Sequence, residues 1–366
     1  MRLGVEAALV DGNVVAGDVE LDDAQIGRVG VSTPGGAGLA VPGFVDVQVN
    51  GFAGVDFAAA SVDDYTRAAT ALAATGVTTF QPTFITLPAQ RYFDGLAVVA
   101  QLEPDRLDAR LHGVHLEGPF LSPRRRGAHD PANMLDPELD LARRFLAAGP
   151  VTHVTLAPEL PGALELVDLF AEAGVVVSVG HSDATAEETH AAFGRGASAV
   201  THLFNAQSGL HHREPGVPGA ALMHESAVVT IIVDGEHLAP DVVRLVFAAA
   251  PGRVALITDA VEAAGVGDGS YVVGDREVTV ADDAVRLEDG TLAGSVATMD
   301  GLVRNVVELG VPLVVALEAA TAVPARLIGR SDLGVLTPGA MADIVVLDDS
   351  LEVQRTLLGG RETYRG

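Results

Sequence analysis

Two histidines stand at the ends of apolar, β-branched runs in the middle of the chain. The runs Val175–Val179 and Ala197–Val200 lead into His181 and His202, with an amphipathic segment between them. This order indicates a strand, a helix and a second strand. In a closed parallel barrel the C-terminal strand ends gather on one face, so the two imidazoles are predicted to point into the same small space.

A carboxylate ends a third apolar run. Glu117 closes the segment LHGVHLE, where burial of an unpaired carboxylate would be costly. Together, Glu117, His181 and His202 form the ligand set of a catalytic zinc-type site, with three protein ligands and one open position. Iron, cobalt and manganese also accept this set. His115, two residues before Glu117, can either support a ligand or be a buried structural histidine.

Asp259 ends the last apolar run, VALITDA. A carboxylate beside a metal-bound water can accept its proton and later pass it to a leaving amine. The alternative is a helix cap or an ion pair. His129 and His237 follow the third and seventh runs in loops, where substrate contact competes with simple exposure and position favours contact with substrate.

Eight strand candidates, most followed by a helical pattern, predict an α/β fold of the TIM-type (β/α)8 barrel class over residues 43–337. They are Phe44–Asn50, Val77–Phe84, Leu111–Glu117, Val151–Ala157, Val175–His181, Ala197–His202, Val228–Val233 and Arg253–Asp259. A doubly wound open sheet has similar patterning. A ring of polar residues at many strand ends favours the closed barrel.

Local signals place several further elements. Ser61 with Asp64, and Thr185 with Glu188, predict capping boxes at two helix starts. The segment Tyr271–Leu292 is predicted to be an inserted hairpin that turns at Asp289-Gly290. Two long loops, 118–137 and 204–225, are expected to carry substrate contacts.

The two termini read as short alternating strands without room for a core of their own. Residues 1–42 include a glycine- and proline-rich loop at Pro34–Gly38, and residues 338–366 include the apolar run 342–347. We therefore predict one small β-sandwich satellite domain built from residues 1–42 and 338–366.

Composition narrows the classes of function. The 366-residue chain has a net charge of −26 and no cysteine or lysine. The charge disfavours nucleic acid and anionic membranes as partners, and a bound phosphate would need a local cationic pocket. The missing lysine excludes Schiff-base chemistry and a carboxylated lysine that bridges two metals. Glu6 and Asp11 interrupt any apolar leader, so we expect a cytoplasmic protein.

Nine short strings in order resemble the N-acetylglucosamine-6-phosphate deacetylase family of the amidohydrolase superfamily. They are PGFVDVQVNG, HLEGPF, GAHD, GHSDAT, THLFNA, REPG, DGEH, TDA and LAGS. The resemblance continues to PGAMADIVVLD near the C-terminus, so it spans nearly the whole chain.

The resemblance implies roles for particular residues. The metal ligands that it implies are Glu117, His181 and His202, with Asp259 as the acid and base and His129 on the acetamide carbonyl. It also implies that Asn205, Ala206 and His237 contact the sugar phosphate. Arg213 is implied to reach the phosphate in the neighbouring subunit of a homodimer. Where many superfamily members carry His-x-His, this chain has Gln48-Val49-Asn50. Amides are poor metal ligands, so one divalent metal per subunit is expected, with zinc first.

Three other readings stay open. The first is another amidohydrolase, which acts on a cyclic imide or an N-acyl amino acid and has the same metal ligands without a phosphate pocket. Arg213 and His237 would distinguish the deacetylase from such an enzyme. The second is a glycosidase that uses Glu117 and Asp259 as its carboxylate pair. The third is a sugar-phosphate sensor without activity. The run Arg124–Arg126 is either solvated surface or a positive rim that attracts phosphate.

Overall fold

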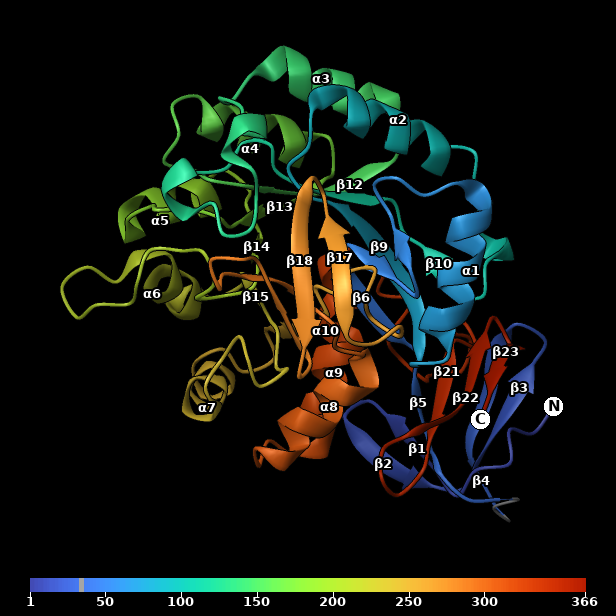
Figure 1. Cartoon of the computed structure of the whole chain (residues 1–366). Coiled ribbons are helices and arrows are strands. Elements are labelled where there is room, and N and C mark those ends of the chain that lie inside the picture. The colour runs from blue at the N-terminus through green and yellow to red at the C-terminus, as the bar shows by residue number, and fades with distance from the viewer. Residues whose placement is uncertain (33–35) are drawn as a thin grey trace.

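The computed structural model describes residues 1–32 and 36–366, so Pro34 and Gly35 of the predicted loop Pro34–Gly38 lie outside the described residues. A barrel surrounded by helices occupies most of the molecule, and a smaller β layer formed by both termini lies beside it (Figure 1). Both parts of the predicted architecture are confirmed.

Eight parallel strands form the barrel. In spatial order they are β6 (Phe44–Val49), β9 (Val77–Phe84), β11 (Val114–Glu117), β12 (Val151–Leu156), β13 (Val176–Val179), β14 (Ala199–Val200), β15 (Val228–Ile231) and β16 (Val254–Leu256). The short β10 (Arg110–Leu111) pairs with β9 just before β11 begins. Every predicted barrel strand is present. Five of the predicted runs close in a polar residue, and in four of them the strand ends before that residue.

The barrel closes where the segment after β16 meets β6. The Asp259 amide donates to the Gln48 carbonyl at 2.9 Å, and Val49 forms a parallel bridge with Ala260. All six residues of β6 and all eight of β9 are buried. This explains why apolar and β-branched residues make up most of both strands, because strands covered on both faces are buried on both sides.

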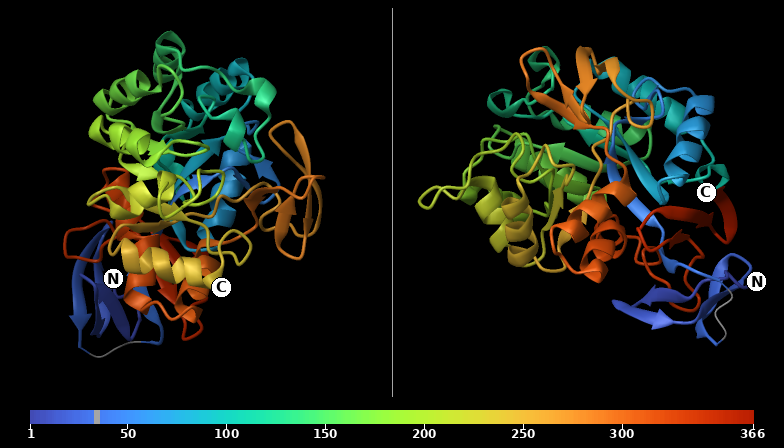
Figure 2. Two further views of the ribbon diagram at one scale, coloured as in Figure 1. Left: turned by 90° about the vertical axis from the view of Figure 1, so that its left-hand side faces the viewer. Right: turned by 60° about the horizontal axis from the view of Figure 1, so that its bottom comes forward.

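Helices cover the outside of the barrel (Figure 2). They are α1 (Val62–Ala73), α2 (Ala89–Val99), α3 (Leu139–Ala148), α4 (Ala163–Glu172), α5 (Ala186–Gly194), α6 (Gly216–Met223), α7 (Pro240–Ala249), α8 (Met299–Glu308), α9 (Leu313–Ala320) and α10 (Ala322–Leu327), with 3-10 turns at Pro104–Arg106, Pro123–Arg125 and Pro131–Asn133. The predicted capping boxes at Ser61 and Thr185 are both formed. None of the helices in the described part of the chain is long and apolar enough to cross a membrane.

The satellite is built around a six-stranded sheet with strands from both termini. Its order is β2 (Asn13–Ala16), β1 (Ala7–Val10), β5 (Leu39–Pro42), β21 (Ile344–Leu347), β22 (Val353–Leu358) and β23 (Arg361–Arg365), and the pair β3 (Asp18–Asp22) and β4 (Gln25–Val31) packs against it through shared apolar residues. A buried ion pair of 2.6 Å joins Asp343 in the satellite to Arg110 in the barrel. The domain boundaries at residues 42 and 338 stay a prediction.

The insertion after β16 is larger than the single hairpin predicted over Tyr271–Leu292. It is a four-stranded antiparallel sheet of β17 (Gly269–Val273), β18 (Arg276–Ala281), β19 (Ala284–Arg286) and β20 (Leu292–Ser295). The predicted turn at Asp289-Gly290 lies between β19 and β20. Two additional turns are at Gly274-Asp275, between β17 and β18, and at Asp282-Asp283, where the two aspartates have φ of 50° and 62°. Aspartate tolerates the left-handed region that such tight turns need.

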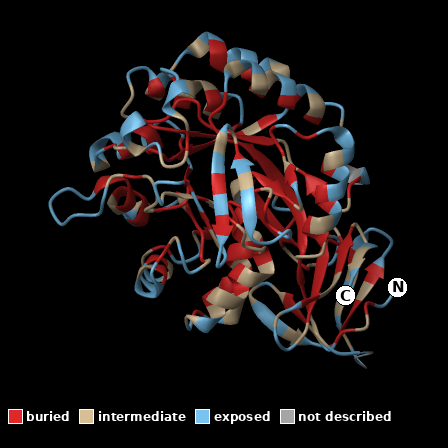
Figure 3. Ribbon diagram, viewed as in Figure 1, coloured by how far each residue is buried: buried red, intermediate tan, exposed pale blue. Residues whose placement is uncertain are grey.

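Figure 1 shows β17 and β18 crossing in front of the barrel, and Figure 3 shows that the barrel strands behind them are buried. A further short hairpin, β7 (Gly51–Phe52) and β8 (Val55–Asp56), follows β6 directly. Both additions lie near the C-terminal strand ends, where a barrel enzyme keeps its functional groups.

Candidate metal centre and substrate cavity

Three of the predicted site residues that follow barrel strands, and also Ala206 with a φ of 50°, sit in left-handed backbone conformation. The φ angles are 46° at His181, 30° at His202 and 49° at Asp259. Non-glycine residues rarely adopt this region, and such strain costs about 1–3 kcal/mol and tends to occur at functional sites. The chain turns sharply at each of these strand ends.

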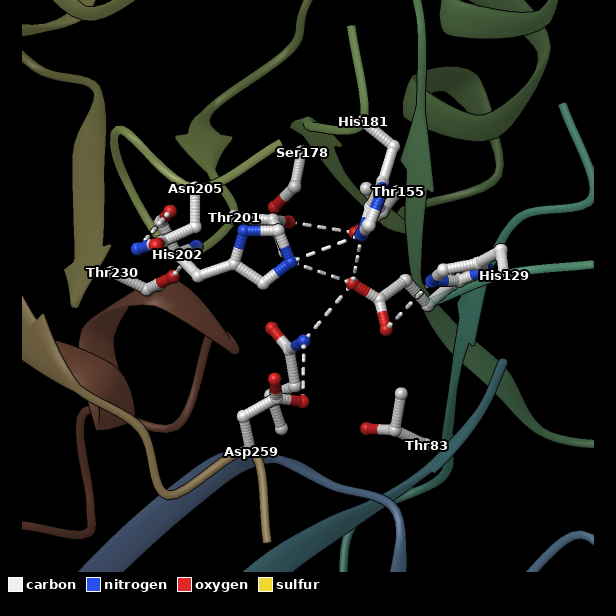
Figure 4. A network of polar contacts seen from close by, with 12 residues as sticks. Thr83, His129, Thr155, Ser178, His181, Thr201, His202, Asn205, Thr230 and Asp259 are labelled. Carbon is white, nitrogen blue, oxygen red and sulfur yellow. Dashed lines mark hydrogen bonds and ion pairs between the residues drawn. The ribbon is translucent and has the colours of Figure 1, made fainter. Parts of the chain in front are cut away.

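Glu117, His181 and His202 meet in one buried cluster, in which Figure 4 labels the two histidines. The His181 Nε2 and His202 Nε2 atoms lie 3.1 Å and 3.0 Å from Glu117 Oε1, and 3.1 Å from each other. The side chains are at most 5% exposed. Burial alone would raise the pKa of Glu117, but its contacts with the two imidazole rings outweigh burial and hold the pKa well below its usual range.

These three atoms fit a divalent cation. Bonds of about 2.0 Å in a tetrahedral site place neighbouring ligand atoms about 3.3 Å apart, close to the separations seen here. The Nδ1 of His181 lies 3.0 Å from the Arg125 carbonyl oxygen, which can only accept a hydrogen bond. The proton of a neutral His181 is therefore on Nδ1, and the lone pair of Nε2 faces the cluster.

His129 approaches the same cluster but has a different protonation pattern. Its Nδ1 accepts the Thr86 backbone N–H at 3.2 Å and lies 2.8 Å from Thr86 Oγ1. Burial, reinforced by His181, lowers the pKa of His129 to about 3. The ring is thus neutral with its proton on Nε2, which lies 3.8 Å from Glu117 Oε2. Although Glu117, His129 and His181 could also hold a cation, this tautomer makes His129 a hydrogen-bond donor rather than a ligand.

Asp259 faces the cluster from across the barrel mouth (Figure 4). Its Oδ1 accepts hydrogen bonds from Asn50 Nδ2 at 2.7 Å and Gln48 Nε2 at 3.1 Å. The same Gln48 amide donates to Glu117 Oε1 at 3.1 Å. Burial, together with the charge of Glu117, raises the pKa of Asp259 to about 6. The amides predicted to be poor ligands thus connect the carboxylate to the cluster.

His115 hydrogen-bonds away from the predicted ligands. Its Nε2 lies 2.7 Å from Thr155 Oγ1 and its Nδ1 lies 3.3 Å from Thr83 Oγ1, while its ring stacks on His153 at 3.9 Å. Burial lowers the pKa of His115 to about 4, so it is neutral. These contacts favour the structural alternative, a polar layer inside the barrel.

A cavity of about 390 Å³ opens above the cluster. Its lining includes the predicted residues Glu117, His129, His181, His202, Asn205, Ala206, His237 and Asp259. Arg213 is exposed and does not line it; its Nη1 contacts His212 Nε2 at 2.8 Å. Arg124 and Arg125 pair with Asp183, which reduces the positive rim expected from the arginine run.

The inserted sheet contributes cavity residues that were not among the predicted site residues. Arg286, Gly290 and the segment 291–294 also line the cavity. The sequence signals in this region are the string LAGS at 292–295, which includes part of this lining, and the predicted turn at Asp289-Gly290. Arg286 carried no local pattern, because it reaches the cavity only through the folding of the whole insertion.

Comparison with known proteins agrees with this geometry. The profile of the amidohydrolase family matches residues 39–363. An N-acetylgalactosamine-6-phosphate deacetylase of Escherichia coli O157:H7 is 39% identical over 291 residues, which cover 78% of this chain and 77% of the relative. An N-acetylglucosamine-6-phosphate deacetylase of Homo sapiens is 39% identical over 303 residues, which cover 79% and 74%.

Solved structures show the same likeness over the whole chain. A mutant N-acetyl-D-glucosamine-6-phosphate deacetylase of Mycobacterium smegmatis, in complex with N-acetyl-D-glucosamine-6-phosphate, superposes with a TM-score of 0.94 at 36% identity over 99% of both chains. The N-acetylglucosamine-6-phosphate deacetylase of Thermotoga maritima gives a TM-score of 0.92 at 33% identity over 100% of both chains.

Proposed function

The chain belongs to the amidohydrolase family, and we propose that it hydrolyses the acetamide of N-acetyl-D-glucosamine 6-phosphate to D-glucosamine 6-phosphate and acetate, in amino-sugar catabolism. The observation that carries this proposal is the convergence of Glu117 Oε1, His181 Nε2 and His202 Nε2 within 3.1 Å of one another, beside Asp259. The similarity to deacetylases supports this reaction over the glycosidase and sensor alternatives.

We assign one divalent metal to Glu117, His181 and His202, with zinc first and iron, cobalt or manganese as alternatives. When bound, such an ion lowers the pKa of a coordinated water and polarises a carbonyl oxygen. Gln48 and Asn50 replace the histidine pair of many superfamily members by amides that donate to carboxylates, which supports a single metal.

The remaining groups of the site then have distinct tasks. Asp259 accepts a proton from the attacking water, and the two amide donors keep its carboxylate aimed at the cluster. His129 donates its Nε2–H to the acetamide oxygen and so stabilises the negative charge that develops there. Asp259 finally delivers its proton to the nitrogen of the leaving amine.

The sugar phosphate is assigned to Asn205, Ala206 and His237, which line the same cavity. The His237 Nδ1 lies 2.7 Å from Asp234 Oδ2, a pairing that fixes the ring. The Escherichia coli relative supports N-acetylgalactosamine 6-phosphate as a second candidate substrate. A homodimer with Arg213 acting across the interface, and a cytoplasmic location, stay predictions.

Acetate release from the 6-phosphates of N-acetylglucosamine, N-acetylgalactosamine and N-acetylmannosamine, combined with metal analysis, tests the proposal. We expect turnover of at least the first substrate and one metal ion per chain. His181→Ala and His202→Ala should each lose the metal and most of the activity together. Two metals per chain would contradict the mononuclear site, and turnover that survives complete removal of metal by a chelator would contradict the mechanism.

A further inference from the structure

The cavity has few charged groups to meet a phosphate. Besides the histidines, the charged residues lining it in the described part of the chain are Glu117, Asp259 and Arg286. In a chain of net charge −26, an anionic substrate needs a cation placed locally. Arg213 does not serve this purpose within one chain, because it is exposed and does not line the cavity.

Arg286 is held at the cavity by two contacts. Its Nη1 donates to the Gly290 carbonyl at 3.1 Å, within the turn that joins β19 to β20. Its Nη2 donates to Glu236 Oε2 at 2.5 Å. Glu236 directly precedes His237, so the ion pair joins the inserted sheet to the loop that carries a predicted substrate residue. The guanidinium therefore lies at the side of the cavity assigned to the phosphate.

We propose that Arg286 binds the phosphate of the substrate, as a specificity-determining residue contributed by the same chain as the metal ligands. This inference rests on the proposed function and names the group that recognises the anionic end of that substrate. A guanidinium has five N–H donors, of which the two contacts engage only part, and its planar fork matches phosphate oxygens.

Removal of the Glu236 charge tests the proposal by the direction in which phosphate binding changes. Its carboxylate competes with the phosphate for the same guanidinium. The side chains of Glu236 and Arg286 are 36% and 44% exposed, so the pair can rearrange. If Arg286 binds phosphate, removal of the Glu236 charge should leave phosphate binding unchanged or tighter. If the pair only clamps the insertion to the barrel, loss of either partner should do equal harm.

The experiment compares kcat and KM of Arg286→Gln and Glu236→Gln for N-acetylglucosamine 6-phosphate and for unphosphorylated N-acetylglucosamine. Charge-assisted hydrogen bonds of about 1.5–3 kcal/mol predict a KM for the phosphate ester raised roughly 10- to 100-fold by Arg286→Gln. We expect kcat/KM for the unphosphorylated sugar to stay within about twofold of wild type. Glu236→Gln should not raise the KM for the ester.

Arg276→Gln is the matched control. Arg276 lies on β18 of the same insertion and does not line the cavity, so this variant removes the same charge from the same sheet. It should behave like wild type on both substrates. Equal losses in Arg286→Gln and Glu236→Gln, on phosphorylated and unphosphorylated sugar alike, would overturn the proposal in favour of a clamp.

Binding measurements separate this inference from the proposed reaction. If the wild type releases no acetate from any hexosamine phosphate, the proposed function fails, and calorimetry with glucosamine 6-phosphate and glucosamine still tests Arg286. A preference for the phosphorylated sugar that Arg286→Gln abolishes supports the anion site. A preference retained in the variant, or absent from the wild type, overturns it.

Discussion

Asp259 is oriented by two amides from a neighbouring strand. Asn50 and Gln48 both donate to Oδ1, and the residue itself holds a φ of 49°. The strained turn and the amide donors together fix the carboxylate toward the cluster. Its raised pKa, to about 6, keeps the group near the range in which it can both accept and return a proton.

We expect Asp259→Asn to bind the metal and the substrate but to turn over at least roughly a hundredfold more slowly, the usual size of a lost general acid and base. Metal content, substrate affinity and kcat measured on the same preparation check this. His202→Ala is the comparison, because it should lose metal as well as activity. A metal-free Asp259→Asn protein would show instead that Asp259 is a ligand.

The junction between β6 and the segment after β16 depends on one buried carboxylate. Asp46 accepts hydrogen bonds from Thr258 Oγ1 at 2.5 Å, Thr258 N at 3.3 Å and Gln48 N at 3.2 Å. Thr258 directly precedes Asp259, so Asp46 anchors the strand end that carries the catalytic candidate. Burial raises the pKa of Asp46 to about 7, and its hydrogen bonds oppose this only in part.

The raised pKa of Asp46 predicts a stability difference that depends on pH. Below about pH 4 the group is protonated in both the folded and unfolded states. As the pH rises toward 7, the unfolded state releases the proton first, so the folded wild type loses stability relative to Asp46→Asn. The difference should change by up to about 1.4 kcal/mol per pH unit and then level off above pH 7.

Urea unfolding of metal-loaded wild type and Asp46→Asn at several pH values between 4 and 8 measures this difference. Asp268→Asn, at an exposed position after the barrel, controls for the loss of one negative charge. If the unfolding free energies of Asp46→Asn and wild type change in parallel across this pH range, the raised pKa of Asp46 is refuted.

The monomer leaves one predicted phosphate ligand outside the cavity. Arg213 is exposed, and the nearby apolar side chains of Leu210 and Met223 are 49% and 79% exposed. The homodimer, in which Arg213 would complete the partner's site while Arg286 acts within its own chain, stays a prediction.

Subunit mixing tests this assembly. Arg213→Ala should raise the KM for the 6-phosphate, and His202→Ala should be inactive. After subunit exchange, a mixed dimer has one site with both lesions and one with neither, so activity should return to about a quarter of the wild-type value per chain. A strictly monomeric protein, or exchange proven by tagging without recovered activity, would show that Arg213 does not act across the interface.

Much of the site follows from the sequence because strand periodicity is local and barrel geometry is general. Apolar runs that end in Glu117, His181, His202 and Asp259 can be recognised within a few residues, and parallel strand ends must converge. The same reasoning predicted eight strands, two capping boxes and a satellite from both termini, all present in the structure.

Other features required the tertiary structure, because they depend on contacts between distant segments. The proton on His129 Nε2 is set by Thr86, from the segment that follows a different strand. The link from Gln48 to Asp259 spans 211 positions. Arg286 enters the cavity only because four short strands fold back over the barrel. No sequence window contains both partners of such contacts, so only the folded chain decides them.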